Sequence, residues 1–151
     1  MRELSDSIEI DAPPAQVWLW IMTLADHYTE WHPDHVSAEW KRGQPNEPGS
    51  ILEVVERLGR HQERLHFEVS SVEPLKCFRF RLRGLIATLL PNGSFTIEPS
   101  RDGTTFTARL AYRFGPLTER AFRSWTAVLR RHMSEEGVNL KAIIESKSPP
   151  A

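Results

Sequence analysis

Apolar and polar residues alternate with a period of two through the middle of the chain. Residues 77–83 give the clearest case, in which Phe78, Phe80 and Leu82 share one face and arginines occupy the other. Such alternation is typical of an antiparallel sheet that is covered on one face only. The pattern predicts strands over residues 7–11, 36–40, 51–58, 63–72, 77–83, 94–98 and 104–114.

The apolar period becomes helical in two places. Residues 15–25 follow Pro13 and Pro14, which suit the first turn of a helix, and carry apolar side chains three and four positions apart. Residues 116–146 repeat this spacing and predict a C-terminal helix of roughly 30 residues. We therefore expect an α+β helix-grip fold, in which a curved antiparallel sheet wraps around the long C-terminal helix. A cavity between the sheet and the helix would suit a small ligand.

Composition indicates one ordinary domain with little net charge. The 151 residues suit a single domain over residues 1–151, with residues 147–151 as a frayed tail. The 19 basic and 20 acidic residues give a net charge of −1, with no basic excess to attract nucleic acid or an acidic membrane. The apolar runs are too short to cross a bilayer, and the first ten residues lack an apolar signal core. We expect a cytoplasmic protein, in which the one cysteine, Cys77, excludes an internal disulfide.

Two ionisable residues lie on the face of the predicted C-terminal helix that should be buried. The apolar stripe that joins Leu129 to Leu140 in steps of three and four passes through His132 and Glu136. Side chains four positions apart project side by side, and a His–Glu pair of this kind can supply two ligands of a metal site. The alternative is an ion pair on a partly exposed edge of the helix. The position on the buried stripe brings the functional interpretation level with this alternative, because an unpaired buried carboxylate is energetically costly.

Glu56 is a further ionisable residue on an apolar face. Period-two counting places it on the same side of its strand as Leu52, Val54 and Leu58. An inward glutamate can be a metal ligand, a general base or the partner of an inward arginine. The strand pattern by itself leaves these three roles open.

The segment WHPDH at residues 31–35 is the third candidate region. Its two histidines flank a Pro-fixed loop before a predicted strand, and such a loop can bring an imidazole to a cavity. His32 lies in the loop, whereas His35 has the parity opposite to the apolar face of residues 36–40. Asp34 could fix the orientation of one of the imidazoles. The alternative is a surface turn with aromatic packing.

These regions together resemble one enzyme family. WHPDHVSAEW, VVERLGR and RRHMSEEGVNL are similar to the 2,4-diacetylphloroglucinol hydrolase and phloretin hydrolase family, and the opening IEIDAPPAQVWLWI resembles the wider START-like superfamily of Bet v 1 and polyketide cyclases. The narrower resemblance implies a zinc ion held by one His, one Glu and a His–Glu pair on the C-terminal helix. Carried over to this chain, the ligands of zinc, or of another divalent cation, would be His35, Glu56, His132 and Glu136. His35 is preferred to His32 because it directly precedes the strand.

Two classes of function follow. The resemblance implies a zinc-dependent hydrolase that cleaves the C–C bond between an acyl group and a phenolic or polyketide-like ring, with His32 or Asp34 moving the proton. The alternative is a non-catalytic binding or cyclase-like module for a hydrophobic or aromatic small molecule. An inward set of metal ligands favours the first class, because a simple carrier does not need several buried ionisable groups. Either class implies a small-molecule partner and no nucleic-acid or membrane partner, with a homodimer left open.

Overall fold

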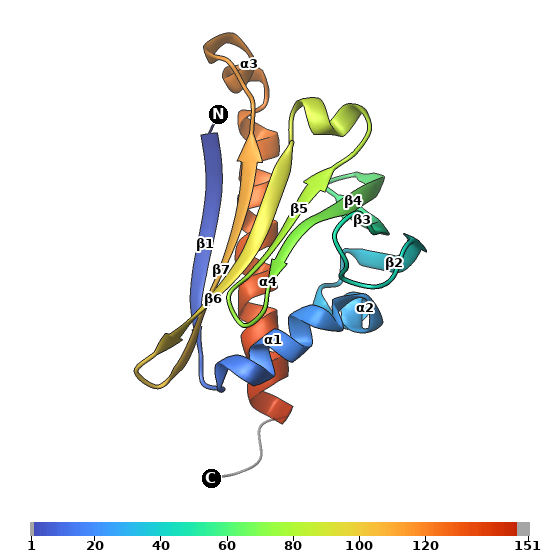
Figure 1. Ribbon diagram of the computed structural model, residues 1–151. Helices are drawn as coiled ribbons and strands as arrows, with labels where there is room; N and C mark the ends of the chain where they lie inside the picture. Colours follow the sequence, from blue (N-terminus) through green and yellow to red (C-terminus); the bar gives the residue numbers. More distant parts are fainter. Residues whose placement is uncertain (1, 148–151) are drawn as a thin grey trace.

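Seven antiparallel strands form one sheet that curves around a long helix (Figure 1). This computed structural model describes residues 2–147, with only the backbone of Leu58 and Glu119, and its strand order is β1-β7-β6-β5-β4-β3-β2. The frayed tail predicted for residues 147–151 lies, apart from Lys147, outside the described residues. The strands are β1 (Arg2–Ile10), β2 (His35–Arg42), β3 (Ile51–Leu58), β4 (His61–Glu73), β5 (Cys77–Leu82), β6 (Asn92–Ser100) and β7 (Gly103–Tyr112).

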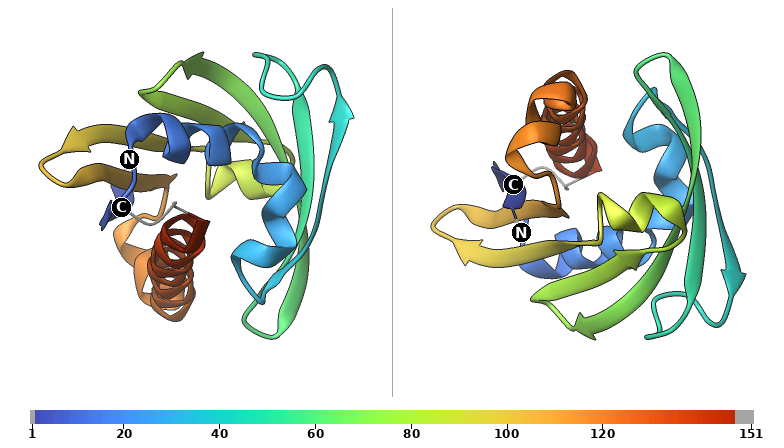
Figure 2. Two further views of the ribbon diagram at one scale, coloured as in Figure 1. Left: turned by 90° about the horizontal axis from the view of Figure 1, so that it is seen from below. Right: turned by 90° about the horizontal axis from the view of Figure 1, so that it is seen from above.

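The longest helix, α4, lies on the concave side of the sheet, while α1 and α2 cross one end of it (Figure 2). This arrangement confirms the predicted α+β helix-grip fold. None of the described helices is long and apolar enough to span a membrane. The helices are α1 (Pro14–Met22), η1 (Leu24–His27), α2 (Tyr28–Trp31), η2 (Leu85–Thr88), α3 (Pro116–Ala121) and α4 (Arg123–Lys147).

Two predicted elements have different bounds in the structure. β1 starts at Arg2 rather than at residue 7, because it pairs with β7 along its whole length. The helix predicted over residues 116–146 breaks at Phe122, whose backbone adopts φ −100° and ψ 10°. The Phe122 ring stacks on Phe114 with 4.9 Å between ring centroids, and Phe114 also contacts Trp125. Aromatic packing on the end of the sheet accompanies this break, and period counting cannot detect it.

The inner face of the sheet and α4 share one apolar core. Leu140 and Ile144 of α4 are fully buried, as are Leu4 and Ile10 of β1. Burial of each such side chain contributes about 1.5–3 kcal/mol to stability. The C-terminal half of α4 is therefore held firmly against β1, and this fixes the position of the residues one and two turns earlier on the same helix.

Replacing Gly103 with Ala is expected to destabilise the fold by about 2–3 kcal/mol, the cost of overpacking a tight site. Gly103 pairs with Ser100 at the turn between β6 and β7. A Cβ at this position would collide with the carbonyl oxygen of Ile10 and lie 2.9 Å from the backbone nitrogen of Ala12. Both obstacles are backbone atoms, so a side-chain rotation cannot relieve the clash. Urea unfolding measures the loss.

Gly115→Ala is the matched control for this experiment. The nearest atom to a Cβ at Gly115 is the Thr118 hydroxyl oxygen at 3.8 Å, an ordinary contact. Gly115→Ala should change the free energy of unfolding by less than about 1 kcal/mol. Similar unfolding midpoints for the two variants would show that the close approach at Gly103 is not a constraint on the fold.

Candidate metal centre and cavity

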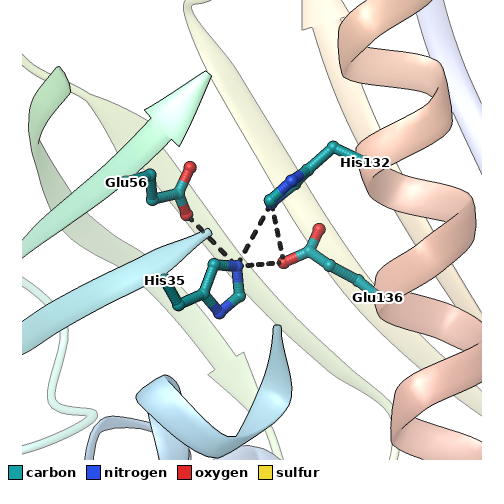
Figure 3. Close-up of side chains that lie close together, drawn as sticks. All are labelled: His35, Glu56, His132 and Glu136. Carbon is teal, nitrogen blue, oxygen red and sulfur yellow. Dashed lines mark hydrogen bonds and ion pairs between the residues drawn. The ribbon is translucent and has the colours of Figure 1, made fainter. Parts of the chain in front are cut away.

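His132 and Glu136 stand one turn apart on α4 and project toward the sheet (Figure 3). His132 is 7% exposed, and Leu129 and Leu140 on the same stripe are also buried. The atoms His132 Nε2 and Glu136 Oε2 lie 3.5 Å apart. The helix therefore presents the pair to the interior, on the face that the apolar stripe predicts.

A β-bulge turns His35 toward the same region. His35 is the first residue of β2 and lies directly opposite Glu56 on β3, but the register shifts between His35 and Ser37. One extra residue, Val36, stands in β2 at this point, and an extra residue reverses the side-chain alternation. His35 is consequently buried together with Glu56, although period-two counting from residues 36–40 predicts the opposite face.

Four side chains converge on one point, and we call His35, Glu56, His132 and Glu136 the tetrad (Figure 3). From His35 Nε2 the distances are 3.2 Å to His132 Nε2, 3.0 Å to Glu136 Oε2 and 3.6 Å to Glu56 Oε1. Four tetrahedral ligands at zinc bond lengths of about 2.0–2.1 Å lie about 3.3 Å from one another. The tetrad thus has the donor types of a four-ligand metal site, and its four donor atoms all lie within 4.8 Å of one another.

The orientation of His35 is fixed by Tyr28. His35 Nδ1 lies 2.9 Å from the carbonyl oxygen of Tyr28, and the two rings stack with 4.0 Å between their centroids. A carbonyl oxygen only accepts hydrogen bonds, so Nδ1 carries the proton of the neutral imidazole. Nε2 then directs its lone pair at the centre of the tetrad, which is the tautomer that a metal ligand needs.

Burial and mutual contact separate the pKa values of the tetrad. Burial, reinforced by the charge of Glu136, raises the pKa of Glu56 to about 8. Burial also opposes the charged forms of His132 and Glu136, but the attraction between these two side chains outweighs the effect of burial. This attraction raises the pKa of His132 to about 9 and, together with His35, lowers the pKa of Glu136 to about 2. Burial lowers the pKa of His35.

His32 and Asp34, predicted to move a proton, lie close to His132 but are not part of the tetrad. His32 Nδ1 accepts a hydrogen bond of 2.9 Å from the backbone N–H of Asp34, so Nε2 carries the proton and donates to Glu135 at 2.7 Å. The His32 ring packs against His132, with 4.3 Å between ring centroids. Neither His32 nor Asp34 is among the side chains that line the cavity. Both nitrogens of His32 are thus engaged, and the residue packs against His132 without lining the cavity.

Sequence reasoning missed Tyr28. Its hydroxyl donates a short hydrogen bond to Glu56 Oε1, its carbonyl orients His35, and its side chain lines the cavity. Tyr28 belongs to the polar-aromatic run before β2. The one feature of the sequence that could have drawn attention to it is the rarity of tyrosine, since the chain contains two. The contact of Tyr28 with Glu56 depends on the packing of α2 against β2, the strand next to β3, which no residue spacing predicts.

An apolar cavity of about 160 Å³ lies between the sheet and α4. Glu56, His132 and Glu136 form part of its wall, so the tetrad borders the cavity. The rest of the wall is mostly aliphatic and aromatic. Its aromatic members besides Tyr28 are Trp31, Trp40, Phe67, Phe78, Phe80, Phe95 and Trp125.

Several solved structures share this fold at low sequence identity. Protein TTHA0849 from Thermus thermophilus superposes with a TM-score of 0.78 at 18% identity, over 98% of this chain and 100% of that one. The ZhuI aromatase/cyclase from Streptomyces sp. R1128 gives 0.75 at 13% identity, over 97% and 94%. Norcoclaurine synthase from Thalictrum flavum, solved with dopamine and hydroxybenzaldehyde, gives 0.75 at 10% identity, over 99% and 89%. Likeness at these identities concerns the fold alone.

The sequence itself matches one family model. The model described as "Polyketide cyclase / dehydrase and lipid transport" matches residues 1–145. No curated protein matches the chain. The match bears out the wider START-like resemblance, while the narrower resemblance to the diacetylphloroglucinol and phloretin hydrolases has no support from these comparisons.

Proposed function

Since the chain belongs to the polyketide cyclase / dehydrase and lipid transport family, we propose that it binds a small aromatic or hydrophobic molecule in its cavity beside a zinc ion. The tetrad would hold the ion, and three of its members border the cavity. Two imidazoles and two carboxylates form a donor set that suits zinc.

The observation that carries this proposal is the convergence of four donor groups around His35 Nε2. Its Nδ1 donates to Tyr28, so a neutral His35 has no proton to offer at Nε2. That nitrogen nevertheless lies 3.0 Å from a carboxylate oxygen of Glu136 and 3.2 Å from His132 Nε2. Such an arrangement is repulsive unless protons or a cation lie between the atoms, and in the metal-free tetrad the protons of Glu56 and His132 have this role. A divalent cation satisfies all four groups at once.

The size of the cavity supports a ligand of about one ring. An apolar cavity of about 150 Å³ accommodates a benzene-sized molecule, and the cavity here measures about 160 Å³. Phe67 and Phe80 pack edge to face in its wall, with 5.0 Å between ring centroids, and offer an aromatic ligand the geometry that ring pairs prefer. Polar groups of the ligand would face the tetrad, and its apolar part would face the sheet.

The reaction that this site suits is hydrolysis of the C–C bond between an acyl group and a phenolic ring. Bound zinc would supply Lewis-acid chemistry for the acyl oxygen or for water. The apolar wall holds the ring and excludes bulk water. Tyr28 lines the cavity, and its hydroxyl, which is hydrogen-bonded to Glu56, would supply the proton that the ring carbon receives. Water provides that hydrogen and the hydroxyl of the released carboxylic acid, so the products are the deacylated phenol and a carboxylate.

Binding without catalysis, or cyclase-like chemistry, is the second candidate. The family description and the likeness to an aromatase/cyclase favour it. A binding module would use the same cavity but would not depend on the metal. The response of ligand binding to a chelator therefore separates the two candidates.

Zinc-loaded protein is expected to release one carboxylate for each deacylated ring from a panel of acylphloroglucinols. Chelation should lower the rate at least about a hundredfold, because the site loses its Lewis acid. At saturating zinc, Tyr28→Phe should lower kcat by about 100–10,000-fold, because it removes the proton at Oη. Chromatography of both products against time provides the measurement.

Tyr112→Phe is the matched control, since Tyr112 is the other tyrosine of the chain and is not among the residues that line the cavity. It should retain the activity of the unaltered protein. Tight aromatic binding that a chelator does not change, with no turnover across the panel, would favour the binding module and reject the hydrolase.

A further inference from the structure

Two leucines project into solvent at one end of the sheet. Leu85 in η2 is 89% exposed and Leu117 in α3 is 93% exposed, the highest values among the large hydrophobic side chains that the structure describes. η2 follows β5 and α3 follows β7, so both lie beyond the same end of the sheet (Figure 1). The backbone N–H of Arg113, just before α3, donates a 2.9 Å hydrogen bond to the carbonyl of Leu89, just after η2.

The same end of the molecule is strongly basic. Residues 83–91 and 113–131 contain one acidic residue, Glu119, and six arginines: Arg83, Arg113, Arg120, Arg123, Arg130 and Arg131. Arg83 pairs with Glu68 and Arg131 pairs with Glu135. The three that lie around Leu117 in the chain (113, 120 and 123) are exposed and form no ion pair with any side chain that the structure describes. The near-zero total charge therefore conceals a cationic end.

We call Leu85, Leu117, Arg113, Arg120 and Arg123 the leucine–arginine patch. The segments that carry this patch also contribute to the cavity wall. The segment of Leu85 contributes Ile86 and Leu90, and the segment of Arg123 contributes Trp125. The patch thus joins the outer surface to the place where an apolar ligand would be held. An apolar ligand has low solubility in water. Direct entry into the cavity from a lipid surface would avoid the free-energy cost of exposing the ligand to water.

We propose that the leucine–arginine patch docks the protein reversibly on an anionic lipid surface. Arginines are attracted to acidic headgroups, and the leucines insert into the interface between headgroups and acyl chains. The exposed leucines favour lipid over nucleic acid or a soluble polyanion, because an apolar side chain gains nothing from phosphates in water. The docked orientation turns η2 and α3, and the cavity wall behind them, toward the lipid. This inference does not depend on the metal or on the reaction.

Co-sedimentation with vesicles tests the proposal. The whole protein should bind vesicles of phosphatidylcholine with about 30 mol% phosphatidylserine at low salt and detach at about 0.5 M salt, where charges are screened. It should bind pure phosphatidylcholine at least about tenfold more weakly. Arg120→Glu with Arg123→Glu should weaken binding by at least about twentyfold, and Leu85→Ser with Leu117→Ser by about tenfold.

The opposite end of the sheet supplies matched controls. Arg101 lies in the turn between β6 and β7, and Leu75 lies in the turn between β4 and β5. Arg101→Glu and Leu75→Ser should bind anionic vesicles like the unaltered protein. Circular dichroism confirms that each variant is folded.

Three results would overturn the proposal. The first is no binding of the unaltered protein to anionic vesicles at low salt. The second is an equal loss of binding in the variants at the two ends. The third is binding to heparin as tight as to vesicles, with no effect of the leucine substitutions, which would make the patch a purely ionic surface.

Discussion

Glu136→Gln is expected to weaken zinc binding by at least about a hundredfold, and His132→Ala to abolish it at micromolar zinc. Each substitution removes one of four donor atoms that lie within 4.8 Å of one another. Glu136→Gln keeps the shape of the side chain but removes one of two carboxylate charges that would neutralise the ion. Competition with a chromophoric chelator measures the affinity, and mass spectrometry measures the metal content.

The neighbouring residue on the helix provides the control. Glu135 is not part of the tetrad and instead accepts hydrogen bonds from His32 at 2.7 Å and from Arg131 at 3.0 Å. Glu135→Gln should therefore change zinc affinity by less than about tenfold, below the 10–100-fold loss typical of a direct partner of a ligand, because the Glu135 carboxylate bonds to His32 and Arg131 and to no member of the tetrad. Unchanged zinc affinity in Glu136→Gln, or equal losses in both variants, would reject the tetrad as a metal site.

Zinc affinity is expected to rise about a hundredfold per pH unit between pH 6 and 7.5, because binding must displace two protons. In the metal-free tetrad, the pKa values of about 8 for Glu56 and about 9 for His132 leave both groups protonated at neutral pH. The pKa of about 2 for Glu136 and the lowered pKa of His35 leave those two groups ready to bind. The dependence should weaken above pH 8, where Glu56 is already ionised, and vanish above pH 9.

Calorimetry in buffers of different ionisation enthalpy counts the released protons directly. About two protons per zinc should be released at pH 7 from the unaltered protein, and about one from Glu56→Gln, which has no proton to lose at that position. The exchange of two protons for one divalent ion leaves the charge of the site unchanged, so the buried tetrad is neutral in both states. Zinc binding without proton release would contradict the assigned protonation states.

The inward direction of the His132–Glu136 pair on α4 could be predicted from the sequence alone. His132 and Glu136 face the interior because an α-helix repeats every 3.6 residues, and this is a local property of the backbone. Glu56 follows from the two-residue period of a strand in the same way. These predictions needed no knowledge of what packs on the other side, since regular elements fix the direction of each side chain relative to its apolar neighbours.

The distribution of charge over the surface could not be predicted from the sequence pattern. Nineteen basic and twenty acidic residues indicate a nearly neutral surface. The fold gathers the arginines of residues 83 and 113–131 at one end, because β5 and β7 run in the same direction, two strands apart in an antiparallel sheet. The strand order determines which loops share an end, and it is set by long-range pairing.

The sequence thus determined the fold class and which faces carry Glu56, His132 and Glu136, while the tertiary structure decided what surrounds them. His35 joins them because one extra residue in β2 reverses the alternation, and the register that creates this bulge is set by packing against β3. Tyr28 reaches Glu56 because α2 packs against β2, which pairs with β3. Periodicity predicts the direction of side chains within one helix or strand. A site depends on where separate elements meet, and only the packed core fixes those positions.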